Sequence, residues 1–193
     1  MSARGLERTV LWRRLDRPAM EHAAFGWQPD QRELAGTVVG VIEGRPAVVT
    51  YRVTCDAAWR TLAVRTSVDI SGPPGGEPVR TLDLRVDDQQ RWRLGNQEVA
   101  SVRGCVDVDL GISPVTNTLP IRRLGLAVGD SREVTAAWVR YPDLHLQPLR
   151  QRYTRLAEDR YRYESPGFAA ELTVDELGIV RRYGDIWVAE AVG

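Results

Sequence analysis

Apolar and polar residues alternate along most of this chain with a period of two. Between residues 62 and 70, large apolar side chains hold every second position except one. Such alternation is typical of a β-strand with one face in the core and one in water. The same pattern predicts strands at residues 37–42, 47–55, 62–70, 82–86, 92–94, 106–110, 134–141, 149–156, 161–164, 169–174 and 179–183.

No helical pattern of 10 to 15 residues separates these strands, which favours an antiparallel sheet over parallel βαβ units. Residues 43–46 form a short connection with a glycine, as a hairpin requires, whereas Gly-Pro-Pro-Gly-Gly at 72–76 ends a strand outright. About eleven or twelve strands in one sheet must curl. We therefore predict a mainly β fold, a single antiparallel curved sheet forming a barrel or half-barrel, in one domain spanning residues 1–193.

The segment from Gly104 to Leu126 departs from the alternation. Ser113 precedes a proline, a common start of a helical turn because the serine oxygen accepts free amide protons. Pro120 prevents one regular helix, and Gly125 is suited to end a second turn. We expect one or two short helices around residues 113–124, which form a polar elbow between two apolar elements.

Composition and charge narrow the possible functions. The 26 basic and 26 acidic residues cancel, so nothing attracts nucleic acid or an anionic membrane non-specifically. Every basic residue is arginine, which excludes Schiff-base chemistry on lysine. Cys55 and Cys105 lie on the apolar register of their strands, which predicts buried, unreactive thiols and not a disulfide framework.

The beginning of the chain carries no signal for export or membrane insertion. Residues 1–14 alternate arginine with single apolar residues, and no window holds the roughly 20 apolar residues of a membrane span. We therefore expect a soluble, cytoplasmic protein without a transmembrane segment. The opening segment up to His22 lacks clean alternation and is interpreted as irregular.

The common catalytic and cofactor motifs are absent from the sequence. It contains no Gly-x-Ser-x-Gly elbow, phosphate loop, dinucleotide fingerprint, His-Glu-x-x-His motif or paired-cysteine zinc spacing. His22 and His145 have no recognisable partner pattern and are interpreted as surface or structural residues. We predict no cofactor and no metal site.

Asp107 and Asp109 are the strongest candidates for chemistry. At positions i and i+2 of a strand, two carboxylates share one face, roughly 7 Å apart, and can hold a cation or divide acid and base roles. Three interpretations stay open: exposure to solvent or pairing with Arg122 and Arg123, ligand binding, and catalysis. Under the second, carboxylate, amide and guanidinium groups would together hold a hydroxyl-rich head group, through Asp107, Asp109, Asn117, Thr118, Arg122 and Arg123.

Tyrosines alternate with arginine near the end of the chain. Tyr161 and Tyr163 share one face of their predicted strand, where they could line an acyl or sugar site or pack at the edge of the core. We count Tyr153, Tyr161 and Tyr163 as candidate ligand-binding residues. The zero net charge argues against stacking on nucleic acid. The six tryptophans are spread through the chain, as core residues would be.

A family resemblance is carried by several of these segments. The main ones are Trp-Arg-Arg-Leu-Asp at 12–16, Met-Glu-His at 20–22, Asp-Val-Asp-Leu-Gly at 107–111 and Thr-Asn-Thr-Leu-Pro-Ile-Arg-Arg-Leu at 116–124, with shorter matches at 36–40, 51–53, 55–60, 138–142 and 151–153. From about Trp12 to Trp187 the chain resembles the glycolipid-binding proteins, a family long classed as a domain of unknown function. The resemblance implies a mostly antiparallel β fold, similar in shape to the bacterial lipoprotein carriers, with a concave apolar surface suited to lipid.

We predict a protein that binds a glycolipid or another amphipathic lipid without turning it over, with the acyl chain in a β-lined cavity and the elbow at its polar mouth. One alternative is a hydrolase or isomerase that acts through Asp107 and Asp109 on a small carbohydrate-like or lipid ligand. Another is a protein-interaction module whose barrel is filled. The sequence leaves the oligomeric state open.

Overall fold

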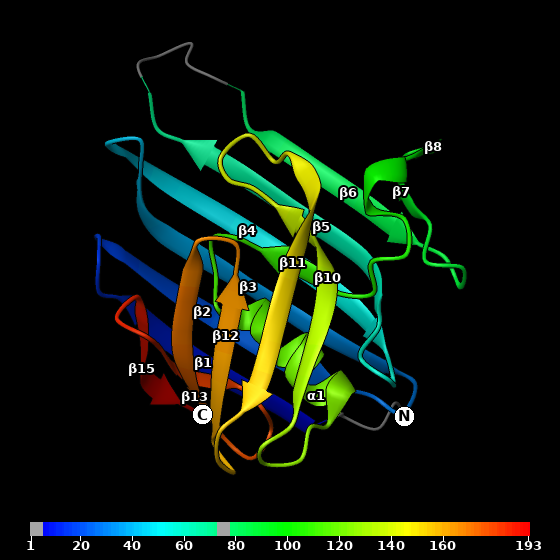
Figure 1. Ribbon diagram of the computed structural model, residues 1–193. Coiled ribbons are helices and arrows are strands. Elements are labelled where there is room, and N and C mark those ends of the chain that lie inside the picture. The colour runs from blue at the N-terminus through cyan, green and yellow to red at the C-terminus, as the bar shows by residue number, and fades with distance from the viewer. Residues whose placement is uncertain (1–5, 73–77) are drawn as a thin grey trace.

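The computed structural model describes residues 6–72 and 78–193. In these residues, fifteen strands form one sheet, in the order β8-β7-β6-β5-β4-β3-β2-β1-β15-β14-β13-β12-β11-β10-β9 (Figure 1). The strands are β1 (Leu6–Arg14), β2 (Ala19–Trp27), β3 (Gln31–Ile42), β4 (Arg45–Asp56), β5 (Thr61–Ile70), β6 (Arg80–Val86), β7 (Trp92–Leu94), β8 (Gln97–Glu98), β9 (Val108–Leu110), β10 (Ser131–Val139), β11 (Leu146–Arg155), β12 (Arg160–Ser165), β13 (Phe168–Val174), β14 (Val180–Tyr183) and β15 (Trp187–Val192).

The sheet is strongly curved and does not close. Neighbouring strands run antiparallel except β9, which pairs with β10 in parallel. The two halves touch where β5 begins: the Thr61 amide donates to the Val106 carbonyl, and the Val108 amide donates to the Thr61 hydroxyl, both over 3.1 Å. These observations confirm the predicted mainly β, half-barrel fold, although the sheet has more strands than the eleven or twelve predicted.

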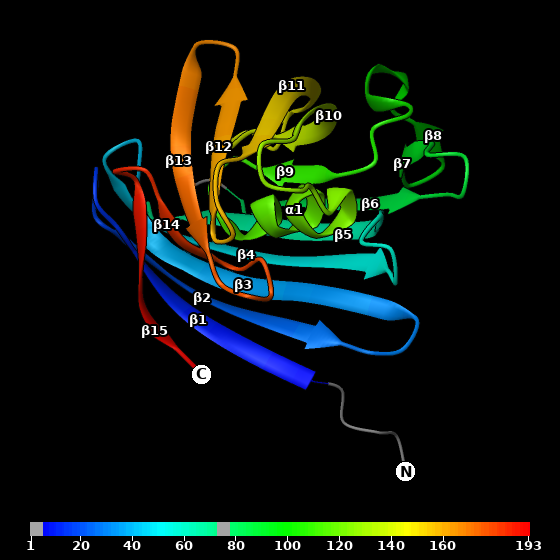
Figure 2. The same cartoon turned by 60° about the horizontal axis from the view of Figure 1, so that its bottom comes forward.

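Alternation along each strand places the core on the concave face. In β4, Ala47, Val49, Tyr51, Val53 and Cys55 are buried, while the residues between them are exposed or part-buried. The concavity is occupied by the single α-helix of the described residues, α1 (Thr118–Leu124), which lies between the two halves of the sheet (Figure 2). Leu119 and Ile121 of this helix join the same core.

The elbow forms as the sequence predicts. A 3₁₀ turn, η2 (Val115–Asn117), follows Ser113, whose hydroxyl accepts the Val115 amide proton over 3.0 Å. The helix α1 follows directly and ends at Gly125, whose φ of 52° is the left-handed conformation that glycine adopts easily. A further 3₁₀ turn, η1 (Ala100–Val102), precedes the elbow.

The interpretation of the opening segment as irregular is wrong. Residues 6–27 form the β1–β2 hairpin, and β1 also pairs with β15, which the sequence pattern did not predict. Arginine hides the alternation, because Arg8 and Arg14 lie on the same register as the buried Val10 and Trp12. By pairing with both β2 and β15, the missed strand β1 joins the N-terminal and C-terminal strands into one sheet.

Two other predictions concern segment limits. The break expected at 72–76 falls mainly on residues 73–77, which lie outside the described residues. The strand predicted at 106–110 is shorter and begins only at Val108. Among the described residues, no helix is both long enough and apolar enough to cross a membrane.

Candidate functional site

A cleft of about 540 Å³ opens on the concave side of the sheet, next to the elbow. Strands from both ends of the chain contribute to it, from β1 and from β9 to β15. Its lining is mixed: the aromatic residues are Trp138, Tyr163, Phe168, Tyr183 and Trp187, and the polar ones are Arg14, Asp109, Ser113, Asn117, Gln147 and Ser165. The cleft thus offers flat apolar surfaces and several hydrogen-bonding groups to one occupant.

Three rings form a continuous aromatic wall. The ring centroids of Tyr163, Phe168 and Tyr183 lie 5.9 to 6.0 Å from one another. Phe168 is 38% exposed, which places it at the mouth, whereas Tyr163 is 3% exposed and lies deeper. Rings at these spacings hold one another in place and present apolar faces to a ligand.

The polar end of the cleft centres on Asp109. The side-chain amide of Gln151 donates a hydrogen bond to its Oδ2. Burial raises the pKa of Asp109 to about 6, and the bond from Gln151 only partly offsets that rise. Nearby, Asn117 accepts a hydrogen bond from the Tyr153 hydroxyl over 2.9 Å and donates to the Pro114 carbonyl over 3.0 Å.

Asp107 has a different environment from Asp109. It is 1% exposed, and Arg123 of α1 binds it with two hydrogen bonds of 2.9 and 2.5 Å. Burial raises the pKa of Asp107, although Arg123 acts in the opposite direction. Of the interpretation that Asp107 faces solvent or pairs with an arginine of the elbow, the pairing is therefore confirmed for Arg123, and the carboxylate is buried.

The remaining predicted residues lie around the cleft and not in it. Thr118 is buried, and its hydroxyl has no hydrogen-bond partner among the described residues. The Arg122 guanidinium lies 5.8 Å from the centroid of the Trp59 ring, so of the two arginines considered as partners for Asp107, Arg123 is the one that binds it. Tyr161 is buried, and the guanidinium carbon of Arg155 lies 5.6 Å from the centroid of its ring. Asp109, Asn117 and Tyr163 are the predicted site residues that line the cleft.

Glu21 is a buried carboxyl that lies in the Met-Glu-His segment of the family resemblance but was not predicted as a site residue. It lies on β2 with 0% exposure, and its Oε1 accepts hydrogen bonds from the hydroxyls of Tyr51 and Ser113. Burial raises the pKa of Glu21 to about 7. The sequence did contain a sign of this burial, because Glu21 lies two residues before Ala23 and four before Phe25, on the apolar register of β2. That segment was not predicted to be a strand.

Comparison with known proteins identifies the family. A family model described as "Putative glycolipid-binding" matches residues 9–189. The chain belongs to this family. A crystal structure of a DUF1089 family protein from Pseudomonas aeruginosa is 36% identical, with a TM-score of 0.75 over 86% of this chain and 88% of that one. None of the curated proteins matches the chain.

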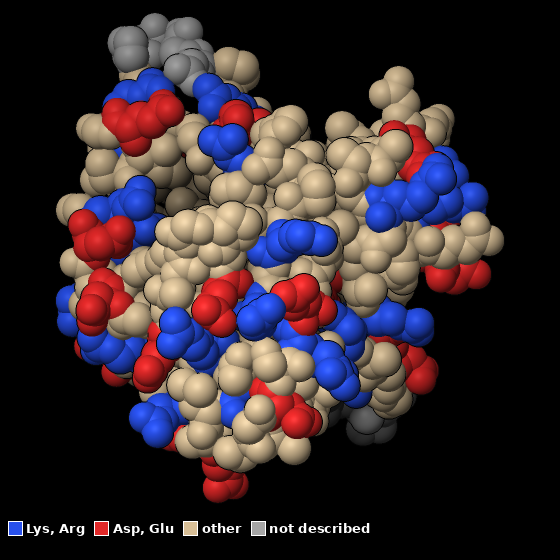
Figure 3. All heavy atoms as spheres, in the orientation of Figure 1, with Lys and Arg blue, Asp and Glu red and all other residues tan. Residues whose placement is uncertain are grey.

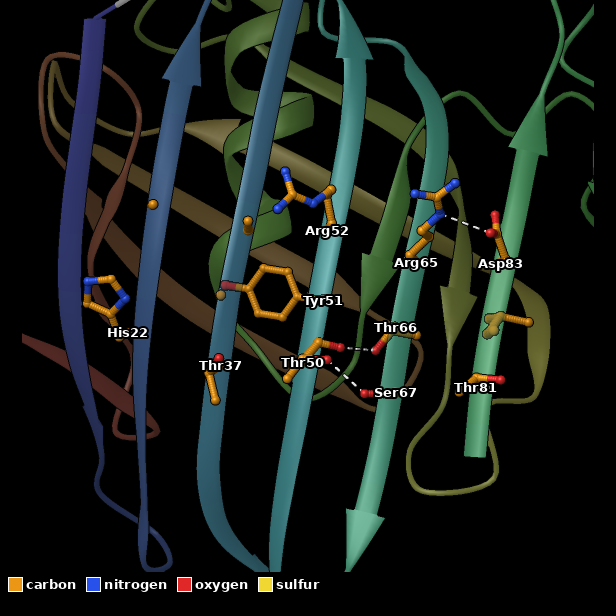
Figure 4. Close-up of a pocket in the computed structure, with 14 residues that line it drawn as sticks. His22, Thr37, Thr50, Tyr51, Arg52, Arg65, Thr66, Ser67, Thr81 and Asp83 are labelled. Carbon is orange, nitrogen blue, oxygen red and sulfur yellow. Dashed lines mark hydrogen bonds and ion pairs between the residues drawn. The ribbon is translucent and has the colours of Figure 1, made fainter. Parts of the chain in front are cut away.

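A second hollow of about 710 Å³, the outer groove, lies on the face of the sheet opposite α1 (Figure 4). Its floor is a row of residues paired across five strands, β2 to β6, in which Thr50 and Ser67 are joined by a 2.7 Å hydrogen bond. The row is His22, Thr37, Thr50, Ser67 and Thr81. The outer groove contains His22, interpreted as a surface residue, and none of the residues predicted to bind a ligand.

The other chemistry-bearing residues give no second cluster. Cys55 and Cys105 are buried and unpaired by a disulfide, and burial raises the pKa of both thiols. Among the described residues, no three His, Cys, Asp or Glu side chains gather as a metal site would require. Acidic and basic side chains are interspersed on the face shown in Figure 3, and ion pairs such as Arg152–Glu133 join neighbouring strands.

Proposed function

We propose that this family member binds a glycolipid or a similar amphipathic lipid in the cleft, without chemical change to the ligand. The observation that carries the proposal is the aromatic wall of Tyr163, Phe168 and Tyr183 in the same cleft as Asp109 and Asn117. Hydroxyl-rich head groups need both donors and acceptors, which carboxylate and amide side chains supply. Membership of the family supports the same ligand class.

The size of the cleft limits what it can hold. Its volume of about 540 Å³ is within the range of small-molecule sites, about 300 to 1,000 Å³. A sugar ring with a short alkyl chain fits this volume, whereas a lipid with two full-length acyl chains exceeds it.

The two kinds of lining would act in different ways. Burying the alkyl part against the rings removes apolar area from water, at about 25 cal/mol per Å². The head group would bond to Asp109 and Asn117, whose other partners, Gln151 and Tyr153, already fix their orientation. Binding would then depend on the wall for affinity and on Asp109 for recognition of the head group.

The alternatives receive less support from the geometry. A filled interaction module does not account for an open cleft with the partly buried carboxyl of Asp109 in its wall. A hydrolase that uses Asp107 together with Asp109 needs both carboxyls at the ligand, but Arg123 binds both oxygens of Asp107. Asp109 lines the cleft and Asp107 does not.

Titration with octyl glucoside, below its micelle concentration, tests the proposal. Trp138 and Trp187 line the cleft, so tryptophan fluorescence reports its occupancy. We expect saturable binding, and roughly 10- to 100-fold weaker binding by Asp109→Ala, because a hydrogen bond to a charged group contributes about 1.5 to 3 kcal/mol. Hydrolysis of the ligand during the titration would instead favour an enzyme.

Thr50→Ala in the outer groove is the matched control, because it removes one polar side chain from the opposite face of the sheet. It should bind octyl glucoside as the wild type does. Loss of binding in Thr50→Ala with retention in Asp109→Ala would place the ligand in the outer groove and contradict the proposal. The absence of saturable binding would contradict it too.

A further inference from the structure

Glu21 is a fully buried carboxyl with one oxygen that accepts no hydrogen bond within the described residues. Both donors to its carboxyl, Tyr51 and Ser113, bond to Oε1, while the buried Oε2 has no partner among those residues. Burial of a carboxylate without a cation bound to it is strongly unfavourable. A residue that only filled the core would be apolar, so a carboxyl at this position calls for a function.

The surrounding sequence is adapted to hold Glu21 in place. Tyr51 reaches it from β4 by crossing β3 at Gly36, where a Cβ atom would lie 2.3 Å from the Tyr51 hydroxyl. Ser113, the other donor, lines the cleft and also accepts the Val115 amide proton at the start of η2. Glu21 is thus one hydrogen bond behind the cleft wall.

The carboxyl groups at this cleft have neutral hydrogen-bond partners, whereas its cation is already paired with an acid. Arg14 is the cation among its described lining residues, and its guanidinium already binds Asp16 with hydrogen bonds of 2.6 and 3.2 Å. Asp109 has the neutral amide of Gln151 as its partner. The groups that face Glu21 are the neutral hydroxyls of Tyr51 and Ser113, with Arg14 acting on it only through space.

We propose that Glu21 and Asp109 together make the cleft selective for head groups that donate hydrogen bonds and carry no negative charge. The inference rests on the proposed function and specifies its ligand class: neutral sugars are accepted, and sugars with a carboxylate are rejected. In this role Glu21 is a specificity-determining residue that acts through the field of its charge, since Ser113 separates it from the ligand.

Ionisation of the two carboxyls sets the pH at which the selectivity operates. Burial holds the pKa of Asp109 at about 6 and that of Glu21 at about 7, so both are negative at pH 8 and both bind protons at pH 5. Tyr141 faces both charges, and each helps to raise its pKa, so this residue stays neutral throughout. Selectivity should therefore be strong at pH 8 and weak at pH 5.

The test compares octyl glucoside with octyl glucuronide, which differ only in a hydroxymethyl or carboxylate group on the sugar. For the wild type at pH 8 we expect the glucoside to bind roughly tenfold or more tightly, because a like charge inside a site of low dielectric is repelled. The selectivity ratio is the dissociation constant of the glucuronide divided by that of the glucoside. Glu21→Gln and Asp109→Asn should each reduce this ratio. At pH 5 the ratio should shrink, while the glucuronide, with a carboxyl pKa near 3.5, stays ionised.

The ratio separates the proposed role from a merely structural one. If Glu21 only supported the fold, Glu21→Gln would weaken both ligands equally and leave the ratio unchanged, which would overturn the inference. Equal affinity of the wild type for both ligands at pH 8 would also overturn it, but would leave the binding function standing. Failure of both ligands to bind would overturn the selectivity inference and the proposed binding function together.

Two controls protect the comparison. Circular dichroism establishes that each variant is folded, and if Glu21→Gln is not, Asp109→Asn and the pH series on the wild type still decide the outcome. Thr50→Ala in the outer groove should keep the wild-type ratio at both pH values, because it leaves the cleft charges in place.

Discussion

Glu21→Gln should remove a pH dependence of stability that the wild type carries. The pKa of Glu21 is raised from 4.5 to about 7 by burial, so between these values the native protein holds a proton that the unfolded chain has released. The contribution of Glu21 to the free energy of unfolding must therefore fall as the pH rises through this window. One pH unit of pKa difference corresponds to about 1.4 kcal/mol, so the whole fall is about 3 kcal/mol.

The glutamine variant isolates this effect. Its side-chain oxygen still accepts the hydrogen bonds from Tyr51 and Ser113, but it cannot ionise. Other groups, Asp109 included, titrate in both proteins and cancel in the difference. Urea unfolding followed by tryptophan fluorescence, at intervals from pH 4.5 to 8, should give a stability difference, variant minus wild type, that rises by about 3 kcal/mol toward high pH.

A stability difference that stays flat across this range would refute the reasoning, since it would mean that Glu21 titrates alike in the native and unfolded states. A difference that falls toward high pH would refute it too. Glu133→Gln is a suitable control, because this carboxyl is exposed and paired with Arg152, and its pKa is lowered and not raised. That variant should not reproduce the rise.

Three further outcomes follow from buried contacts. Arg123→Ala leaves Asp107 buried without its ion-pair partner, so urea unfolding should give a loss of about 3 to 5 kcal/mol, partly recovered by adding Asp107→Asn; no recovery would contradict the pairing. Gly36→Ala forces a Cβ against Tyr51 and should cost about 1 to 3 kcal/mol, whereas an unchanged melting temperature would show that the contact is absent. Cys55 should resist a thiol reagent at pH 8 in the native protein and react after unfolding, because burial raises its pKa; fast native labelling would contradict this.

Sequence reasoning succeeded where one short-range rule determines the structure. Alternation alone placed Val49, Tyr51 and Val53 on the buried face of β4. Capping and helix-ending residues alone placed the elbow, with its 3₁₀ turn, its helix and Gly125 in the left-handed conformation. The pairing of Asp107 with Arg123 could also be predicted, because both lie in this one segment.

The features that the sequence did not predict depend on contacts between distant parts of the chain. The β1–β2 hairpin was missed because Arg8 and Arg14 lie on its apolar register and interrupt the alternation there. The burial of Asp107 requires α1 to fold back over it. Glu21 becomes recognisable as a site residue only when Gly36, Tyr51 and Ser113 are brought beside it from three other segments.

A crystal structure of the protein with octyl glucoside would show directly which surface holds the ligand. We expect the sugar ring beside Asp109 and Asn117, with the alkyl chain along Tyr163 and Phe168. Ligand bound in the outer groove, with the cleft taken up by rearranged side chains, would contradict it.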